Sequence, residues 1–252
     1  MLALPHIDMS AVTPQPTRTN AIATVLRDEI LAGQYRSGER LPSERDLSER
    51  FSASRGAVRE ALKQLEQLGI ASIQHGGARV VAIEECTLDV LGPLIDLHEI
   101  PDPKLVDEVM QMIGVLMREA AVAALEKASD EQLREAQHII DGILEAGAAP
   151  IQQFEGFRRL GQFYVEVADH LVLRLMINGL RTSFLARITP SDTLSEHDSE
   201  ALIEPVGRIR SALSARNAEE LGAAMQDVNR RFRESARQTL ERARAQRTES
   251  TQ

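Results

Sequence analysis

Apolar side chains recur at intervals of three and four residues along most of the chain, a spacing typical of helices that bury one face. The first such stretch runs from about Asn20 to Gly33, where the glycine is expected to end the helix. A second, short helix is predicted from Ser43 to about Phe51. Ser43 and Asp46 are spaced as a capping box, in which each side chain bonds the other residue's backbone N–H.

A third helix is predicted between the cap residue Ser54 and Gly69. Its apolar residues fall on one face: Val58, Ala61, Leu62, Leu65 and Leu68. After Gly69 the pattern changes to two short β-prone runs, 70–73 and 78–81, with a glycine-containing loop between them. Runs of this kind predict a β-hairpin. Residues 17–83 are therefore expected to form three helices and a hairpin.

From residue 87 onward only amphipathic helical patterns are found. They cover about 88–98, 104–127, 130–146, 151–168, 170–188, 197–215 and 218–247. We predict a mainly α chain, with an all-α antiparallel bundle of six or seven helices over 88–247. Residues 84–87 are expected to be a linker. Residues 1–16 and 248–252 have no helical period, and we expect a disordered arm and a disordered tail there.

Charge is unevenly divided between these two parts. The whole chain has a formal net charge of −9, which by itself argues against a protein that binds nucleic acid. Residues 17–83, however, contain ten basic and eight acidic side chains, a net of +2, so that the remainder carries −11. The acidity belongs to the tails and the helical part, so the net charge of the whole chain does not argue against a basic face on residues 17–83.

The composition excludes several classes of protein. A single cysteine, Cys86, rules out a disulfide framework and a cysteine-rich zinc cluster. No apolar run is long enough to span a membrane, and the first residues lack the pattern of a secretory signal. We therefore expect a cytoplasmic protein that does not associate with membranes.

The short turn between the second and third helices has the spacing of a helix-turn-helix. In the third helix Arg55 and Arg59 lie about 40° apart around the axis, near its start and away from the apolar stripe. Arginine is suited to a bidentate contact with guanine O6 and N7 in the major groove. Gly56 and Ala57 are small, so the backbone can come close to DNA, and Arg45 in the preceding helix lies near the same groove.

The hairpin supplies a second candidate contact with DNA. His75 and Gly76 lie at its tip, where a wing would reach the minor groove. Arginine pairs on helices are usually only solvated, and many helix-turn-helix segments never bind DNA. The combination of turn, paired arginines, N-cap, hairpin and local positive charge favours DNA binding.

Three separated motifs resemble the winged helix of the GntR family of bacterial transcription regulators. They are Gly38–Leu47, Ser54–Leu62 and Leu65–Ile70, and they agree with the family in order and spacing. The resemblance implies that operator DNA is contacted by Arg45, Arg55, Arg59 and His75 with Gly76. It also implies that Ser54 and Gly56 lie close to the DNA backbone or bases.

The helical part resembles, more diffusely, the effector-binding domain of the FadR subfamily. Many members hold a divalent metal with one Asp and three His. An ungapped placement anchored on Ala168–His170 puts those ligands near Phe157, Gly161, Val206 and Val228, none of which binds metal. We therefore expect no metal and no cofactor, unless the placement is displaced by a turn.

Apolar residues at these positions suggest a pocket for a fatty acid, an acyl-CoA or another apolar small molecule. Candidate lining residues are Ile113, Leu116, Met117, Phe157, Leu160, Phe163, Tyr164, Leu175, Met176 and Phe184. The plainer interpretation of such a stripe is an ordinary core. The arginines of the last helix, which include Arg230 and Arg247, are likewise most simply a solvated surface.

The function predicted from these observations is a repressor-type regulator, not an enzyme. A homodimer would bind a near-palindromic operator on double-stranded DNA, and an effector would change the separation of its two heads. The alternatives are a metal-dependent sensor of a small carboxylate and a dimerisation module without an effector. An enzyme is disfavoured because the chain has no phosphate loop, nucleophile elbow or metalloprotease motif.

Overall fold

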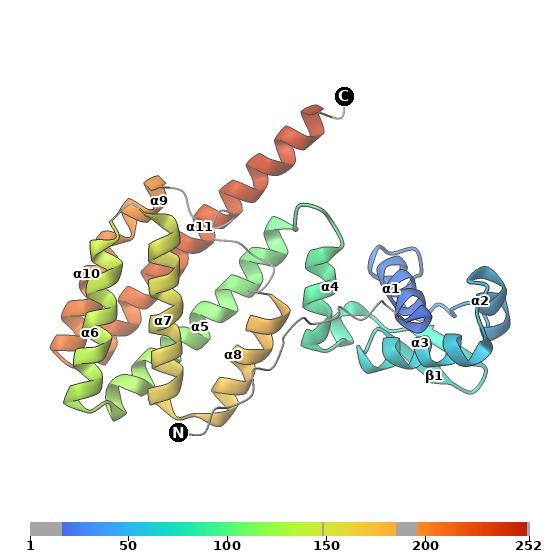
Figure 1. The fold of residues 1–252 in the computed structure, drawn as a ribbon, viewed down its shortest axis with the longest axis horizontal. Coiled ribbons are helices and arrows are strands. Elements are labelled where there is room, and N and C mark those ends of the chain that lie inside the picture. Colours follow the sequence, from blue (N-terminus) through green and yellow to red (C-terminus); the bar gives the residue numbers. More distant parts are fainter. Residues whose placement is uncertain (1–16, 148, 185–195, 251–252) are drawn as a thin grey trace, which may run out of the picture. The chain divides into compact units, whose positions relative to one another are not determined.

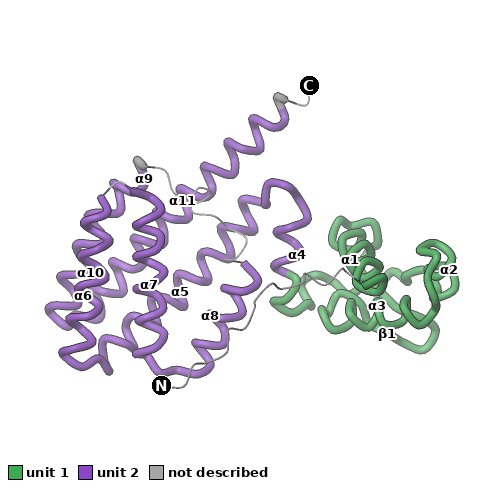
Figure 2. The backbone as a smooth tube through the Cα atoms, in the orientation of Figure 1, with its two compact units in different colours: residues 1–90 green, residues 91–252 purple. Residues whose placement is uncertain are grey.

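A computed structural model describes residues 17–147, 149–184 and 196–250, with the side chains of residues 196, 197, 249 and 250 excepted. The arm predicted over 1–16 lies outside the described residues. The chain divides into two compact units, residues 1–90 and 91–252 (Figure 2). The predicted mainly α fold is confirmed, with a single two-stranded sheet among the described residues.

Unit 1 begins with three helices, α1 (Arg18–Leu31), α2 (Glu44–Arg50) and α3 (Arg55–Gln67) (Figure 1). Both predicted caps of the second and third helices are confirmed, including the reciprocal Ser43–Asp46 capping box. The core of the unit is made of fully buried apolar side chains that project from all three helices, among them Leu26, Leu47, Val58 and Leu65. This packing holds the helix-turn-helix on α1.

The hairpin consists of β1 (Ala71–Gln74) and β2 (Gly77–Val80), paired antiparallel with Ala71 opposite Val80. A third segment, which the sequence pattern predicts to be a loop, also pairs with this hairpin. Residues 38–41 run along the other edge of β2, where Gly38 N–H donates to the Val80 carbonyl and Leu41 N–H to the Ala78 carbonyl, both at 2.9 Å. The wing is therefore anchored to the segment that leads directly into α2.

The predicted linker packs against unit 1. Residues Ile83–Glu85 form a 3₁₀ turn, and the Cys86 thiol lies 3.4 Å from the Gly69 carbonyl oxygen at the end of α3. Burial and the neighbouring Glu85 and Glu84 raise the pKa of this thiol. The division between units falls after a second 3₁₀ turn, Leu88–Val90.

Unit 2 is an all-helical bundle, as predicted. Its helices are α4 (Leu91–Asp96), α5 (Pro103–Lys127), α6 (Asp130–Glu145), α7 (Pro150–Ala168), α8 (Leu171–Ser183), α9 (Glu196–Ala201), α10 (Ile203–Ser214) and α11 (Ala218–Ser250). The long helices α5 and α11 pack along each other, and α7 and α10 cover them (Figure 1). No helix of the described residues is long and apolar enough to cross a membrane.

Unit 2 has two apolar clusters. The larger joins α5, α6, α7, α10 and α11 and includes the fully buried Ile140, Leu160 and Leu221. The smaller joins α4, α5, α8 and α11 around Ile95 and Phe184. Leu116 of α5 packs against both, so this residue connects the two clusters.

The helix predicted over 197–215 is the main correction to the expected elements. It is two helices, separated at Leu202. Pro205 explains the break, because its ring would clash with the carbonyl of residue 201 in a continuous helix but is tolerated in the first turn of α10. At the C-terminus α11 continues through residues 248–250, which we had assigned to a tail. The end predicted for α8, residues 185–188, lies outside the described residues.

Candidate nucleic-acid interface

The turn between α2 and α3 contains a left-handed residue and is held by an arginine of α1. Ser52 adopts a left-handed conformation with φ of 47°. The Arg18 guanidinium donates to the carbonyls of Phe51, at 3.1 Å, and Ser52. Arg50 lies 4.8 Å above the Phe51 ring and pairs with Glu29 of α1. These contacts tie the turn and the end of α2 to α1, a role for Arg18 and Glu29 that no motif in the sequence indicates.

The start of α3 is open to solvent. Ser54 accepts a hydrogen bond from the Ala57 N–H at 3.2 Å and thereby caps the helix. Ser54, Arg55 and Gly56 are exposed and Ala57 is half-buried, whereas Val58 is fully buried. The uncapped amides and the positive end of the helix dipole therefore face solvent beside Arg55, which favours an anion at this end.

The three predicted DNA-contacting arginines differ in their partners. Arg59 donates from Nε and Nη2 to the two carboxylate oxygens of Glu44, at 3.1 and 2.9 Å. Arg45 pairs with Glu49 at 3.2 Å. Arg55 has no hydrogen bond or ion pair with any described residue. The hydrogen bonds from Arg59, with further help from the charge of Arg55, lower the pKa of the Glu44 carboxyl below its ordinary value.

The Glu44–Arg59 pair brings two of the predicted sites together. Glu44 opens α2, next to Arg45, and Arg59 lies in the second turn of α3. The pair therefore places the start of α2 beside the exposed start of α3. Local sequence patterns do not indicate this contact, because it joins side chains fifteen residues apart whose meeting depends on the angle between the helices.

The wing tip is the third candidate contact. His75 and Gly76 form the two-residue loop between β1 and β2, and both are exposed. Gly76 has φ of 104°, a conformation that side chains other than glycine rarely adopt. The imidazole thus stands at the outermost point of the hairpin. Whether it reaches DNA remains a prediction.

The predicted effector-pocket residues do not line one described cavity. Leu160 and Tyr164 are 1% exposed in the larger cluster, with Phe157 packed against it and edge-on to Phe232 at 5.0 Å. Ile113 packs against the smaller cluster, and Met117 lies against Gly161, where a Cβ would stand 3.2 Å from its sulfur.

The candidate pocket residues of α8, Leu175 and Met176, are exposed rather than buried. Met176 and Leu175 are 43% and 60% exposed on the outer side of the helix, so in this structure they cannot line an internal pocket with the others. Phe163 and Phe184 are both buried.

Tyr164 has an unusual environment for a polar residue. Its hydroxyl is buried and has no hydrogen-bond partner among the described residues. Burial raises the pKa of this phenol well above its ordinary value. Buried polar groups nearly always have partners, so an orphan hydroxyl in the middle of a predicted pocket is a candidate contact for a ligand.

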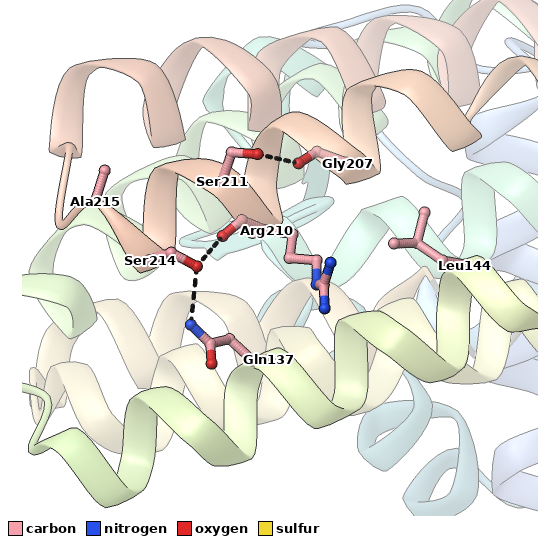
Figure 3. A pocket seen from close by; sticks show the side chains of 7 residues that line it. All are labelled: Gln137, Leu144, Gly207, Arg210, Ser211, Ser214 and Ala215. Atoms are coloured by element: carbon pink, nitrogen blue, oxygen red, sulfur yellow. Dashed lines mark hydrogen bonds between the residues drawn. The ribbon is translucent and has the colours of Figure 1, made fainter.

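A hollow among the described parts of unit 2 is open to solvent and lined by both polar and apolar atoms. It encloses about 590 Å³ between α6 and α10 and is lined by Gln137, Leu144, Gly207, Arg210, Ser211, Ser214 and Ala215 (Figure 3). Gln137 donates to the Ser214 hydroxyl at 3.0 Å, and Arg210 pairs with Asp141 at 2.7 Å. None of the residues predicted for the effector pocket lines this hollow.

Histidines of unit 2 are scattered. His98 and His138 are exposed, and His170 caps α8 by accepting the Leu173 N–H at its Nδ1, at 3.2 Å. The side chain of His197 is not described. Within the described residues no three metal-binding side chains gather at one place.

Comparison with known proteins gives a family for the first unit. Residues 18–81 match the profile of the bacterial regulatory proteins of the gntR family. This range covers α1 to β2, so the resemblance proposed from the three motifs is confirmed.

Similar proteins extend the match into unit 2. An uncharacterized HTH-type transcriptional regulator of Mycobacterium tuberculosis is 36% identical over 108 residues, 37% of this chain and 45% of that protein. The fatty acid metabolism regulator protein of Serratia proteamaculans is 29% identical over 159 residues, 61% of this chain and 64% of that protein. The chain thus matches less than two thirds of the length of either relative.

A solved structure shows a similar fold. It is that of Lar, which is described as controlling expression of the Listeria monocytogenes agr system. The TM-score is 0.53 at 15% identity, over 86% of this chain and 95% of that one.

Proposed function

We propose that this chain, whose residues 18–81 match the gntR family of bacterial regulatory proteins, is a DNA-binding transcriptional regulator. It would act as an effector-responsive repressor that binds a near-palindromic operator as a homodimer. The start of α3 carries the proposal: Arg55 is exposed there without a partner among the described residues, and Arg59 stands one turn further on. In a dimer, two such helix starts enter successive major grooves.

Each proposed contact has its own chemistry. Arg55 and Arg59 bind guanine O6 and N7, while Arg45 contacts the rim of the same groove. Ser54, Gly56 and Ala57 let the backbone of α3 approach phosphates. His75 and Gly76 enter the adjacent minor groove. The exposure of all these residues except the half-buried Ala57 supports this assignment.

For unit 2 we propose an apolar effector with one polar group, such as a fatty acid or its acyl-CoA. Its apolar part would separate side chains of the larger cluster, and the Tyr164 hydroxyl would bind the polar group. The unpartnered hydroxyl supports this assignment, as does the name of the Serratia proteamaculans relative. Binding would repack α5 and α7 and so change the separation of the two heads.

Selection of bound sequences from random duplex DNA, repeated with candidate effectors, tests the proposal. An enriched inverted repeat, bound by two chains and released on addition of an acyl-CoA, is the expected result. Native mass spectrometry with acyl-CoA and with citrate plus zinc separates the two kinds of sensor. Citrate bound only with zinc, and no acyl-CoA bound, would contradict the apolar effector and favour the metal-dependent alternative.

A further inference from the structure

Two arginines stand directly opposite each other on the outer face of the wing. Arg40, in the segment before α2, forms an antiparallel bridge with Arg79 of β2. Residues paired in this way project their side chains on the same side of a sheet, and like charges in this position repel each other. Both arginines are exposed. The bridge between two arginines therefore has no evident stabilising role in the free protein and calls for another explanation.

The local structure holds the two guanidinium groups in place without neutralising them. Arg79 Nη1 donates to the Gly38 carbonyl at 2.9 Å. The Arg40 guanidinium lies over Gly77, where a Cβ would stand 3.0 Å from its Nε. Gly77 has φ of 129°, so the wing uses a glycine at the one place where Arg40 needs room. The Arg79 guanidinium thus lies against the backbone of Gly38, and the Arg40 guanidinium against that of Gly77.

No described carboxylate pairs with either arginine. The carboxylate of the adjacent Glu39 instead accepts a hydrogen bond from the Arg36 backbone N–H, at 2.8 Å. Four other arginines of unit 1 have acidic partners: Arg27 pairs with Asp28, Arg45 with Glu49, Arg50 with Glu29 and Arg59 with Glu44. Arg18, Arg36 and Arg55 have none among the described residues. What distinguishes the wing pair is that its two arginines, both without a carboxylate, face each other across neighbouring strands, where an external anion can supply the missing negative charge.

We propose that Arg40 and Arg79 form a phosphate-binding site for the sugar–phosphate backbone of duplex DNA. This inference rests on the proposed function and adds two contacts that the motifs do not assign. Planar guanidinium groups bind phosphate oxygens through paired N–H donors. A phosphate between them converts their mutual repulsion into two attractions. Such contacts fix the position of the wing on the duplex and do not read its sequence.

The salt dependence of binding to a short duplex of mixed sequence tests this site, because no operator is needed. Each phosphate contact contributes about −0.9 to the slope of log K against log salt concentration, or about eightfold in affinity between about 1 M and about 0.1 M salt. We expect Arg40→Gln and Arg79→Gln each to lower the steepness by about 0.9 and to bind about eightfold more weakly near 0.1 M. Arg40→Lys should keep most of the slope.

Arg158→Gln is the matched control, because it makes the same substitution at an exposed arginine of α7 in unit 2, with the same change in net charge. Its slope should equal that of the wild type. Both wing variants should stay folded, with far-ultraviolet circular dichroism spectra like that of the wild type. Unchanged slopes in both folded variants would overturn the phosphate site. A wild-type protein that binds no duplex would overturn the proposed function itself.

Discussion

Arg59 in α3 and Glu44 at the start of α2 form a bidentate ion pair, with N–O distances of 3.1 and 2.9 Å. The same guanidinium edge that would bind guanine is therefore bound to a carboxylate in the free protein. DNA must displace Glu44 before Arg59 can read a base. The exchange costs little at a guanine, which replaces both acceptors, and more at a base that offers none.

Glu44→Gln tests this competition. We expect the variant to bind unrelated duplex several-fold more tightly, because one negative charge leaves the interface, and to bind the operator with a smaller gain. The ratio of the two affinities, measured by fluorescence anisotropy, should fall. Glu155→Gln in α7 makes the same charge change away from unit 1 and should leave the ratio unaltered. Weaker operator binding by Glu44→Gln would instead show that the carboxylate positions Arg59 for DNA.

Substitution of the two arginines of α3 separates their contributions to specificity. Arg55→Ala and Arg59→Ala are each expected to cost about 1–3 kcal/mol of operator binding, with a smaller loss on unrelated duplex. Gel-shift titrations with both duplexes measure the difference. Lys63→Ala removes a positive charge one turn beyond Arg59 in α3, where Lys63 pairs with Glu60, and should affect both duplexes alike. If both arginine variants bind the operator like the wild type, the site is wrongly assigned.

Tyr164→Phe tests the proposed ligand contact in unit 2. Since its buried hydroxyl has no partner among the described residues, removal should leave stability unchanged or raise it by up to about 1 kcal/mol. We expect native mass spectra of the variant to show no bound acyl-CoA, while its melting temperature stays the same or rises. The chain's other tyrosine, Tyr35, interacts with Arg50, so Tyr35→Phe should lower stability and leave ligand binding intact. Full acyl-CoA binding by Tyr164→Phe would exclude its proposed role.

The pairing of α5 with α11 predicts a pH-dependent stability. Arg233 donates to both oxygens of Asp107, at 2.8 and 2.6 Å, and this hydrogen bonding lowers the pKa of the Asp107 carboxyl below its ordinary 3.8, with Arg237 adding to the effect. A carboxyl whose pKa is lowered by folding stabilises the protein above its unfolded-state pKa, and loses this contribution as the pH falls through the folded-state value.

Asp107→Asn should therefore be less stable than the wild type by about 1–3 kcal/mol near neutral pH, with a difference that shrinks as the pH falls below about 4. Urea unfolding at several pH values measures it. Glu108→Gln is the control, because Glu108 forms only an exposed pair with Lys104 at 3.8 Å and should change stability little at any pH. A deficit for Asp107→Asn that stays constant with pH would contradict the assigned role of this ion pair.

Local signals in the sequence were sufficient for most of the fold. The caps at Ser43 and Ser54 depend on side chains within three residues, and each is found where it was predicted. Features that depend on residues distant in sequence were missed. The pairing of residues 38–41 with β2 joins segments about forty residues apart, and nothing in the composition of the loop identifies it.

The same distinction applies to the sites. The residues expected to contact DNA could be named because they lie within two short motifs and a hairpin tip. Their partners could not, since the meeting of Glu44 with Arg59 or of Arg40 with Arg79 depends on how the elements pack. Periodicity could not show which of the apolar residues proposed for the effector pocket are buried and which lie on the surface. In the structure Tyr164 is buried and Met176 is exposed.

Replacing individual operator guanines with 7-deazaguanine tests most directly whether the start of α3 reads bases, because this analogue removes only the N7 acceptor. At the guanine bound by Arg55, the wild type should lose about tenfold in affinity, while Arg55→Ala, which has already lost the contact, should bind both duplexes equally. We predict that Arg55→Ala is insensitive to the analogue at one guanine and that Arg59→Ala is insensitive to it at another. Equal sensitivity of the wild type and both variants at every guanine would contradict it.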